Sequence, residues 1–135
     1  MRLTIWGCRG SVPTPGPDTV GYGGNTSCVE VLLDDGSVFV LDAGTGIRPL
    51  GLELLDRGTN RVHLFLTHLH LDHLEGLRFF APLWDERVTL DIWGPPSPRN
   101  ALNIAVAFCG GSALPPSSIA IQPLLGSSRS ATERL

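Results

Sequence analysis

Residues 67–76 read Thr67-His68-Leu69-His70-Leu71-Asp72-His73-Leu74-Glu75-Gly76. This stretch holds three of the four histidines of the 135-residue chain, with an aspartate among them. The preceding residues 61–66 (RVHLFL) are few and rich in Val, Leu and Phe, which predicts a buried strand. Apolar side chains at Leu74, Leu77 and Phe80 predict a short helix after it. We therefore expect the histidines where a strand ends, at the edge of a sheet.

The spacing of these residues suits a metal site. In extended backbone, side chains two residues apart point the same way, so His68 and His70 can reach one ion. Asp72 and His73 follow as the chain turns, which directs them to a neighbouring point. Imidazole and carboxylate are ligands that zinc and similar divalent ions accept. A reading without metal is a capping box, in which Asp72 and Glu75 open the following helix.

The pattern Thr-His-x-His-x-Asp-His resembles the signature of the metallo-β-lactamase fold hydrolases. In that family the first two histidines bind one metal ion, the aspartate and the last histidine bind a second, and a hydroxide bridges the two. The resemblance implies that His68 and His70 hold the first ion and that Asp72 and His73 hold the second. It also implies a catalytic role for Asp72, which would orient the hydroxide. The two ions would be zinc, with manganese or iron as alternatives.

Composition narrows the class of protein. The net charge is −3 and no basic run exists, so the electrostatic footprint of a nucleic-acid-binding protein is lacking. Three cysteines without CxxC spacing suit free thiols in a reducing compartment. No apolar run approaches the length of a membrane span, and the first ten residues are too short for a signal peptide. We expect a soluble, cytoplasmic protein with one domain.

The remaining pattern predicts strands at residues 3–6, 28–33, 38–41 and 88–93, and an amphipathic helix at 47–57. Together with the family resemblance, this implies an α+β fold. It would be the N-terminal half of the four-layer αββα sandwich, with a mixed β-sheet and helices on one face. The resemblance covers residues 1–98, which we take as a partial domain.

Residues 7–26 contain six glycines and three prolines, which predicts a loop. A surface connection without function is one reading. However, residues 7–11 (GCRGS) and 24–27 (GNTS) resemble the opening of the phosphodiesterase branch of the family. That branch includes ribonuclease Z and cyclic-phosphodiester hydrolases. The resemblance implies that Asn25 and Thr26 support the site or touch substrate, and that the substrate is a small-molecule or nucleotide phosphodiester.

Two further residues have alternative readings. Asp42 follows an apolar strand and precedes glycines, which is typical of a turn or a helix cap. In the family a matching Asp lies beneath the metal ions, where it could accept a hydrogen bond from a ligand imidazole. His63 lies in the middle of a predicted strand, so we expect it to be structural. Ribonuclease Z has Gly-Glu-Gly where this chain has Gly44-Thr45-Gly46, which counts against tRNA processing.

The composition changes after residue 96. Residues 97–135 hold one acid, and residues 110–135 are rich in Ser, Pro, Ala and Gly, so we expect a divergent, disordered tail over 99–135. The family continues with a His, an Asp and a His as further metal ligands, but no histidine follows His73. We expect a truncated gene or a frameshift near residue 98, with natural divergence as the alternative.

Three functions follow from this reading. The first is a two-metal phosphodiester hydrolase that is impaired in this chain. The second keeps the metals and cleaves a lactam, thioester or lactone, and the third is a catalytically inactive metal-binding fragment. In each case one sheet face would be uncovered, which favours self-association.

Overall fold

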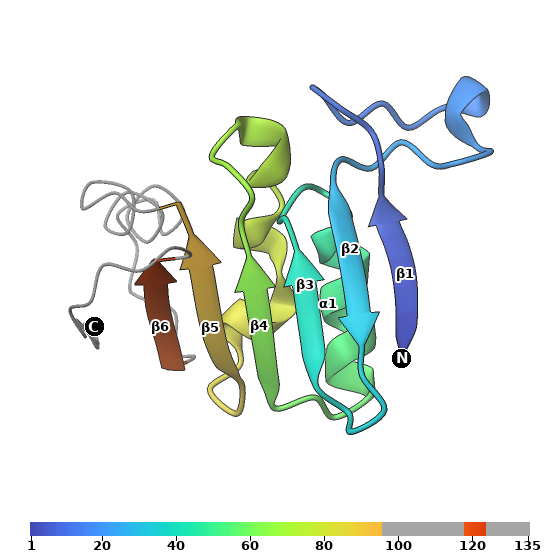
Figure 1. Cartoon of the computed structure of the whole chain (residues 1–135). Helices are drawn as coiled ribbons and strands as arrows, with labels where there is room; N and C mark the ends of the chain where they lie inside the picture. Colours follow the sequence, from blue (N-terminus) through green and yellow to red (C-terminus); the bar gives the residue numbers. More distant parts are fainter. Residues whose placement is uncertain (96–117, 124–135) are drawn as a thin grey trace.

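The computed structural model of the chain describes residues 1–95 and 118–123. They form a six-stranded sheet with the order β1-β2-β3-β4-β5-β6 (Figure 1). The strands are β1 (Arg2–Gly7), β2 (Cys28–Leu32), β3 (Val38–Leu41), β4 (Arg61–Phe65), β5 (Thr89–Gly94) and β6 (Ser118–Pro123). β1, β2 and β3 pair antiparallel, whereas β3, β4, β5 and β6 pair parallel. The prediction of a mixed sheet is confirmed.

The helices α1 (Ile47–Asp56), η3 (Leu77–Phe79) and η4 (Ala81–Trp84) lie on one face of this sheet (Figure 1). The turn η2 (Leu71–His73) lies beyond the carboxyl end of β4, and η1 (Pro17–Thr19) belongs to the loop between β1 and β2. The predicted amphipathic helix is confirmed, since α1 buries Ile47, Leu50 and Leu54 against the sheet. The prediction of helices on one face is likewise confirmed.

The short helix expected after the histidines is present in 3-10 form. Short 3-10 turns follow one another there, and the buried side chains Leu74, Leu77, Phe80 and Leu83 recur at every third residue. Three residues per turn is the period of a 3-10 helix, which packs such a stripe against one surface. An α-helical spacing would rotate part of this stripe away from the core.

The hydrophobic core lies between the sheet and α1 with the 3-10 turns. Alternate residues of β2 to β5 point into it, as expected for strands with period two. The core residues from these strands are Cys28, Val38, Val40, Val62, Leu64, Leu90 and Ile92. The sequence-derived strands therefore have their apolar sides where the pattern predicts them.

The opposite face of the sheet is mostly apolar, with His63 and Asp91 as polar members. Residues in register form two rows across the strands: Ile5, Val29, Leu41, Phe65 and Trp93, and Leu3, Val31, Phe39, His63, Asp91 and Ala120. Rings stack along this face, with centroids 5.1 Å apart for Phe39 and His63 and 5.8 Å apart for Phe65 and Trp93. Within residues 1–95 and 118–123, no helical segment covers it.

The C-terminal expectation differs from the structure at one place. Ser118–Pro123, in the segment expected to be disordered, forms β6 and pairs parallel with β5. Residues 96–117 and 124–135 lie outside the described residues. The expected domain end near residue 98 falls in the first of these ranges. In the described part of the chain, no helix has the length and apolarity needed to cross a membrane. The cytoplasmic location stays a prediction.

Candidate metal centre

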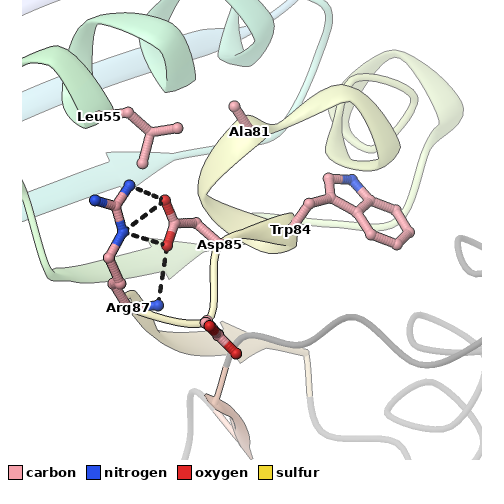
Figure 2. A pocket seen from close by; sticks show the side chains of 6 residues that line it. Leu55, Ala81, Trp84, Asp85 and Arg87 are labelled. Atoms are coloured by element: carbon pink, nitrogen blue, oxygen red, sulfur yellow. Dashed lines mark hydrogen bonds and ion pairs between the residues drawn. The ribbon is translucent and has the colours of Figure 1, made fainter.

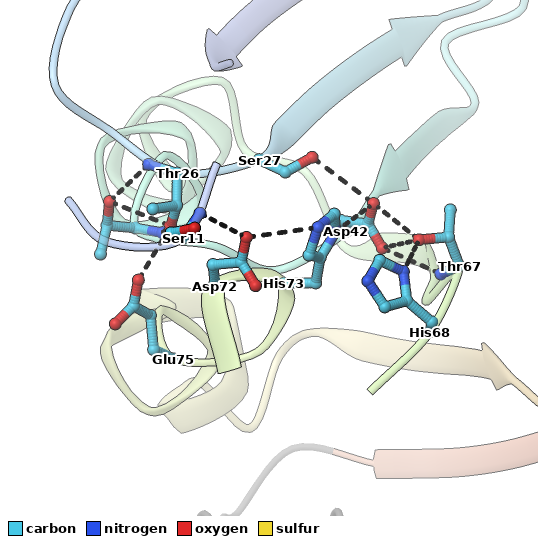
Figure 3. A network of polar contacts seen from close by, with 10 residues as sticks. Ser11, Thr26, Ser27, Asp42, Thr67, His68, Asp72, His73 and Glu75 are labelled. Carbon is cyan, nitrogen blue, oxygen red and sulfur yellow. Dashed lines mark hydrogen bonds and ion pairs between the residues drawn. The ribbon is translucent and has the colours of Figure 1, made fainter. Parts of the chain in front are cut away.

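The predicted metal ligands follow the carboxyl end of β4. Because β3, β4 and β5 are parallel, their carboxyl ends lie at the same edge of the sheet. Asp42 comes directly after β3, and Thr67 comes two residues after β4. The backbone N–H of Asp42 donates to the carbonyl of Phe65 at 2.8 Å, which continues the pairing of the two strands into the site. The edge of the sheet thus brings the Asp42 loop and the histidine segment together (Figure 3).

The structure gathers all four predicted ligands in this segment. The ring centroids of His68 and His70 are 4.6 Å apart, and those of His68 and His73 are 4.0 Å apart. Nε2 of His73 lies 3.6 Å from Oδ2 of Asp72. Within residues 1–95 and 118–123, no three His, Cys, Asp or Glu side chains are placed to hold one ion. The donor types and their proximity fit divalent metal ions, but the donor atoms do not converge as a complete ligand set.

Asp42 lies behind the histidines and is 5% exposed. Its backbone has φ of 63°, in the left-handed region that Asp and Asn tolerate better than most residues. Its carboxylate accepts the backbone N–H of Thr67 at 2.9 Å and the Thr67 hydroxyl at 2.9 and 3.0 Å. Oδ2 of Asp42 also lies 2.8 Å from Nδ1 of His73. Asp42 thus lies against the ring of His73 without a hydrogen bond to its Nδ1, and its role beside a metal ligand stays a prediction.

The two loops are joined by backbone contacts as well. The N–H of Ala43 donates to the carbonyl of His73 at 2.8 Å, and the N–H of Gly76 donates to the carbonyl of Ala43 at 2.9 Å. A Cβ on Gly76 would overlap the carbonyl oxygen of Gly44, and a Cβ on Gly44 would overlap the carbonyl oxygen of Asp72. Only glycine permits this approach. These contacts hold the backbone of the histidine segment close against the backbone of the Asp42 loop.

The capping-box reading of Asp72 and Glu75 is wrong. Oδ2 of Asp72 accepts the backbone N–H of Ser11, which is 61 residues away, at 2.9 Å. Oε1 of Glu75 accepts the hydroxyl of Thr26 at 3.0 Å. Both carboxylates are therefore used in contacts with the glycine-rich loop. The hydrogen bond from Ser11 lowers the pKa of the Asp72 carboxyl, and the nearby His73 lowers it further.

The glycine-rich loop is attached to the site through Thr26. This residue is fully buried, and its N–H donates to the hydroxyl of Thr45 while the N–H of Thr45 donates to the hydroxyl of Thr26, at 2.9 and 2.8 Å. The Thr45 hydroxyl also donates to Oδ1 of Asn25 at 3.2 Å. Because Thr26 is fully buried, these contacts hold the loop from inside the protein. Asn25 is half-buried beside it.

His63 lies apart from the cluster, as expected. Its Nδ1 is 3.2 Å from Oδ2 of the buried Asp91, which also accepts from Nε of Arg61 at 2.9 Å. Its ring stacks on Phe39 in the middle of the sheet.

A surface pocket of about 450 Å³ lies elsewhere in the molecule, next to η4 (Figure 2). It is lined by Leu55, Ala81, Trp84, Asp85, Glu86 and Arg87. An ion pair between Asp85 and Arg87 forms one side of it, with Nε of Arg87 2.9 Å from Oδ1 of Asp85. None of the predicted metal ligands lines this pocket. Most of its lining residues come directly before β5, whereas the histidines come after β4. Because β4 and β5 are parallel, the pocket and the histidines lie at opposite ends of these strands.

Three contacts of the site were not predicted from the sequence. They are those of Ser11 with Asp72, of Thr67 with Asp42, and of Glu75 with Thr26. The contacts of Ser11 and Glu75 join distant segments, so no local pattern predicts them. Thr67 stands directly before the histidines and was readable as part of the motif, but its contacts with both Asp42 and His68 are visible only in the structure.

Comparisons with known proteins agree with this geometry. The ribonuclease Z of Haloarcula marismortui is 36% identical over 87 residues, which are 63% of this chain and 24% of that protein. A diphosphatase from the PhnP family has a similar fold, with a TM-score of 0.60 and 22% identity over 91% of this chain and 50% of that one. The chain thus spans a quarter to a half of the length of these relatives. The profile of the Metallo-beta-lactamase superfamily matches residues 21–91, which are more than half of the chain and contain Asp42 and every predicted ligand. The chain belongs to the metallo-beta-lactamase superfamily.

Proposed function

We propose that the chain carries the metal-binding edge of a metal-dependent hydrolase that acts on phosphodiester bonds. The observation that supports this most is the gathering of three imidazoles and Asp72 at one edge of the sheet, in front of the buried Asp42. His68 and His70 would hold one divalent ion, and Asp72 and His73 would hold a second. Zinc suits these ligands, and manganese or iron are alternatives.

Divalent ions at such a site polarise a phosphoryl oxygen and make water a better nucleophile at neutral pH. The residues of the chain supply orientation. The N–H of Ser11 holds Oδ2 of Asp72 and favours its ionised form, so the carboxylate can accept a hydrogen bond from an attacking water and orient it. His70 is exposed to solvent. Asp42 holds Thr67, and the Thr67 hydroxyl contacts the ring of His68.

Two features support a phosphodiester rather than another substrate. The relatives are named as a ribonuclease and a diphosphatase, and both names refer to phosphorus–oxygen bonds. The loop of residues 7–26, which resembles the phosphodiesterase branch, is attached to the site through Ser11 and Thr26. The net charge of −3 favours a small-molecule or nucleotide phosphodiester over a long nucleic acid. Gly44-Thr45-Gly46 remains a departure from ribonuclease Z.

A second candidate is a metal-binding chain without catalytic activity. Catalytic zinc sites normally have three protein ligands and a water, whereas each ion here would have two. No histidine follows His73 in the 135 residues. We therefore expect negligible turnover from this chain by itself. No observation in the structure favours a lactam, thioester or lactone.

The test separates binding from turnover. Purified chain with added zinc or manganese is mixed with bis(p-nitrophenyl) phosphate, and separately with the lactam nitrocefin. We expect zinc-dependent binding of the phosphodiester by calorimetry, weakened in Asp72→Ala, together with negligible hydrolysis. Zinc-dependent binding of nitrocefin alone would contradict the substrate class. Robust phosphodiester hydrolysis that is lost in Asp72→Ala would show that the missing ligands come from elsewhere, such as a second subunit.

A further inference from the structure

The hydroxyl of Thr67 connects a carboxylate to an imidazole. Oγ1 of Thr67 donates to the Asp42 carboxylate, at 2.9 Å from Oδ1 and 3.0 Å from Oδ2. The same oxygen lies 2.9 Å from Nδ1 of His68 (Figure 3). Asp42 is buried, and its contact with the Thr67 hydroxyl is partly buried.

The protons in this chain of contacts can be counted. A threonine hydroxyl has one proton and two lone pairs, and a carboxylate only accepts. Because the one hydroxyl proton points to Asp42, the hydroxyl can contact Nδ1 of His68 only as an acceptor. Nδ1 must then carry the imidazole proton. In the neutral ring this leaves the lone pair on Nε2, which is the atom free to bind a metal ion.

The second imidazole contacts the same carboxylate. Nδ1 of His73 lies 2.8 Å from Oδ2 of Asp42, while its Nε2 is on the side of Asp72. This contact with Asp42 is not a hydrogen bond, because Nδ1 of His73 has no hydrogen-bond partner among the described residues. The hydrogen-bonded route from Asp42 to an imidazole runs through Thr67 to His68.

We propose that Thr67 is a positioning residue. Its hydroxyl, held by Asp42, accepts a hydrogen bond from Nδ1 of His68 and so fixes the tautomer that leaves the lone pair on Nε2 free for a metal ion. The proposal rests on the proposed metal function for its consequence, but the tautomer itself is a property of the metal-free chain. Ser27 offers a matched comparison. Its hydroxyl also lies near Asp42, 3.5 Å from Oδ2, and the structure shows no contact between it and an imidazole within residues 1–95.

The test compares Thr67→Val, which keeps the shape and removes the hydroxyl, with Thr67→Ser, which keeps the hydroxyl. Ser27→Ala is the control for loss of a hydroxyl near Asp42. Nitrogen-15 NMR of the metal-free proteins at about pH 8, above the ordinary pKa of imidazole, reports the tautomer of each ring. Zinc affinity is measured separately by competition with a chelator.

We expect the Nδ1–H form of His68 to predominate in the wild type, in Thr67→Ser and in Ser27→Ala, and to lose its predominance in Thr67→Val. Zinc affinity should fall about 10- to 100-fold in Thr67→Val only, the usual effect of losing such a partner. An unchanged tautomer in a folded Thr67→Val would overturn the proposal, as would equal losses of affinity in Thr67→Val and Thr67→Ser. If the wild type bound no zinc, the metal function would fail, while the NMR comparison would still decide the role of Thr67.

Discussion

Nδ1 of His73 lies 2.8 Å from Oδ2 of Asp42, although these residues are 31 positions apart in the sequence and follow different strands. The contact exists because β3 and β4 are parallel neighbours, so the residues that follow them meet at one edge of the sheet. Nδ1 of His73 is buried and makes no hydrogen bond within residues 1–95 and 118–123, so its close contact with Asp42 is an ion-pair approach rather than a hydrogen bond. Asp42 is the charged group next to this nitrogen.

Asp42→Asn tests the role of this carboxylate. Asparagine tolerates the left-handed backbone at φ 63°, so the fold should be retained. The amide has one oxygen and lacks the negative charge, so it should hold Thr67 and His73 less well. We expect zinc affinity to fall about 10- to 100-fold with little change in melting temperature. Unchanged affinity together with a lower melting temperature would make Asp42 a turn residue only.

The assignment of the histidines can be tested by metal analysis. His68→Ala combined with His70→Ala should abolish most of the bound zinc, because it removes both ligands of one proposed ion. His63→Ala is the matched control, since this ring pairs with Asp91 and lies outside the cluster. It should leave the zinc content nearly unchanged. An equal loss of zinc from the control would mean that His63 is a ligand.

The pair of Asp85 and Arg87 predicts a pH dependence of stability. Hydrogen bonds from Arg87 lower the pKa of Asp85 from 3.8 to about 2. A carboxyl with a lowered pKa stabilises the folded state above its ordinary pKa, and this contribution disappears as the pH falls from about 4 to about 2. Asp85→Asn should therefore have a lower urea midpoint than the wild type at neutral pH, and the difference should vanish near pH 2. The pair is exposed on the arginine side, so the difference should be small and should shrink in high salt. A difference that grows on acidification would refute this account.

The open face of the sheet predicts self-association of the described fold. Phe65 and Trp93 stack on this face and are only half-buried. Replacing both by Gln should shift sedimentation from associated species toward the monomer, because apolar area is removed from the contact. Leu52→Gln, which changes an exposed apolar residue of α1 on the other face, should have no such effect. A wild-type chain that stays monomeric at every concentration would contradict the prediction.

The strands β1 to β5, α1 and the location of the histidines were predictable from local patterns, because each depends on the period of apolar residues within one segment, whereas β6 was not predicted. Contacts between distant segments were not. Glu30 lies in a strand read as apolar, yet it is fully buried in an ion pair with Arg57 and accepts from Nε1 of Trp6 at 3.1 Å. Its neighbours in sequence give no indication of either partner. The failure of the capping-box reading has the same cause, since the partner of Asp72 is Ser11.

The 3-10 turns show a different limit. Leu74, Leu77 and Phe80 fit either a short α-helix or a 3-10 helix, since both place residues three apart on one side. What decides between them is the burial of Leu83 three residues later and the proline at position 82, together with the packing of Gly76 against the Asp42 loop. Tertiary contacts therefore select the helix type here.

The contact between Gly44 and Gly76 has a consequence for how this protein can change during evolution. Gly76 has φ of −77°, which any residue can adopt, so the backbone itself does not exclude alanine. The exclusion comes mainly from the carbonyl of Gly44, with Cγ2 of Ile47 also too close to an added Cβ, and no choice of side chain relieves the backbone overlap. In a library of variants selected for zinc binding, exposed Leu71 should accept many residues, whereas position 76 should return glycine nearly always. Residues without side chains would then be as intolerant of replacement as the histidines, and a functional descendant could not reach a different residue at position 76 without first moving the whole Asp42 loop.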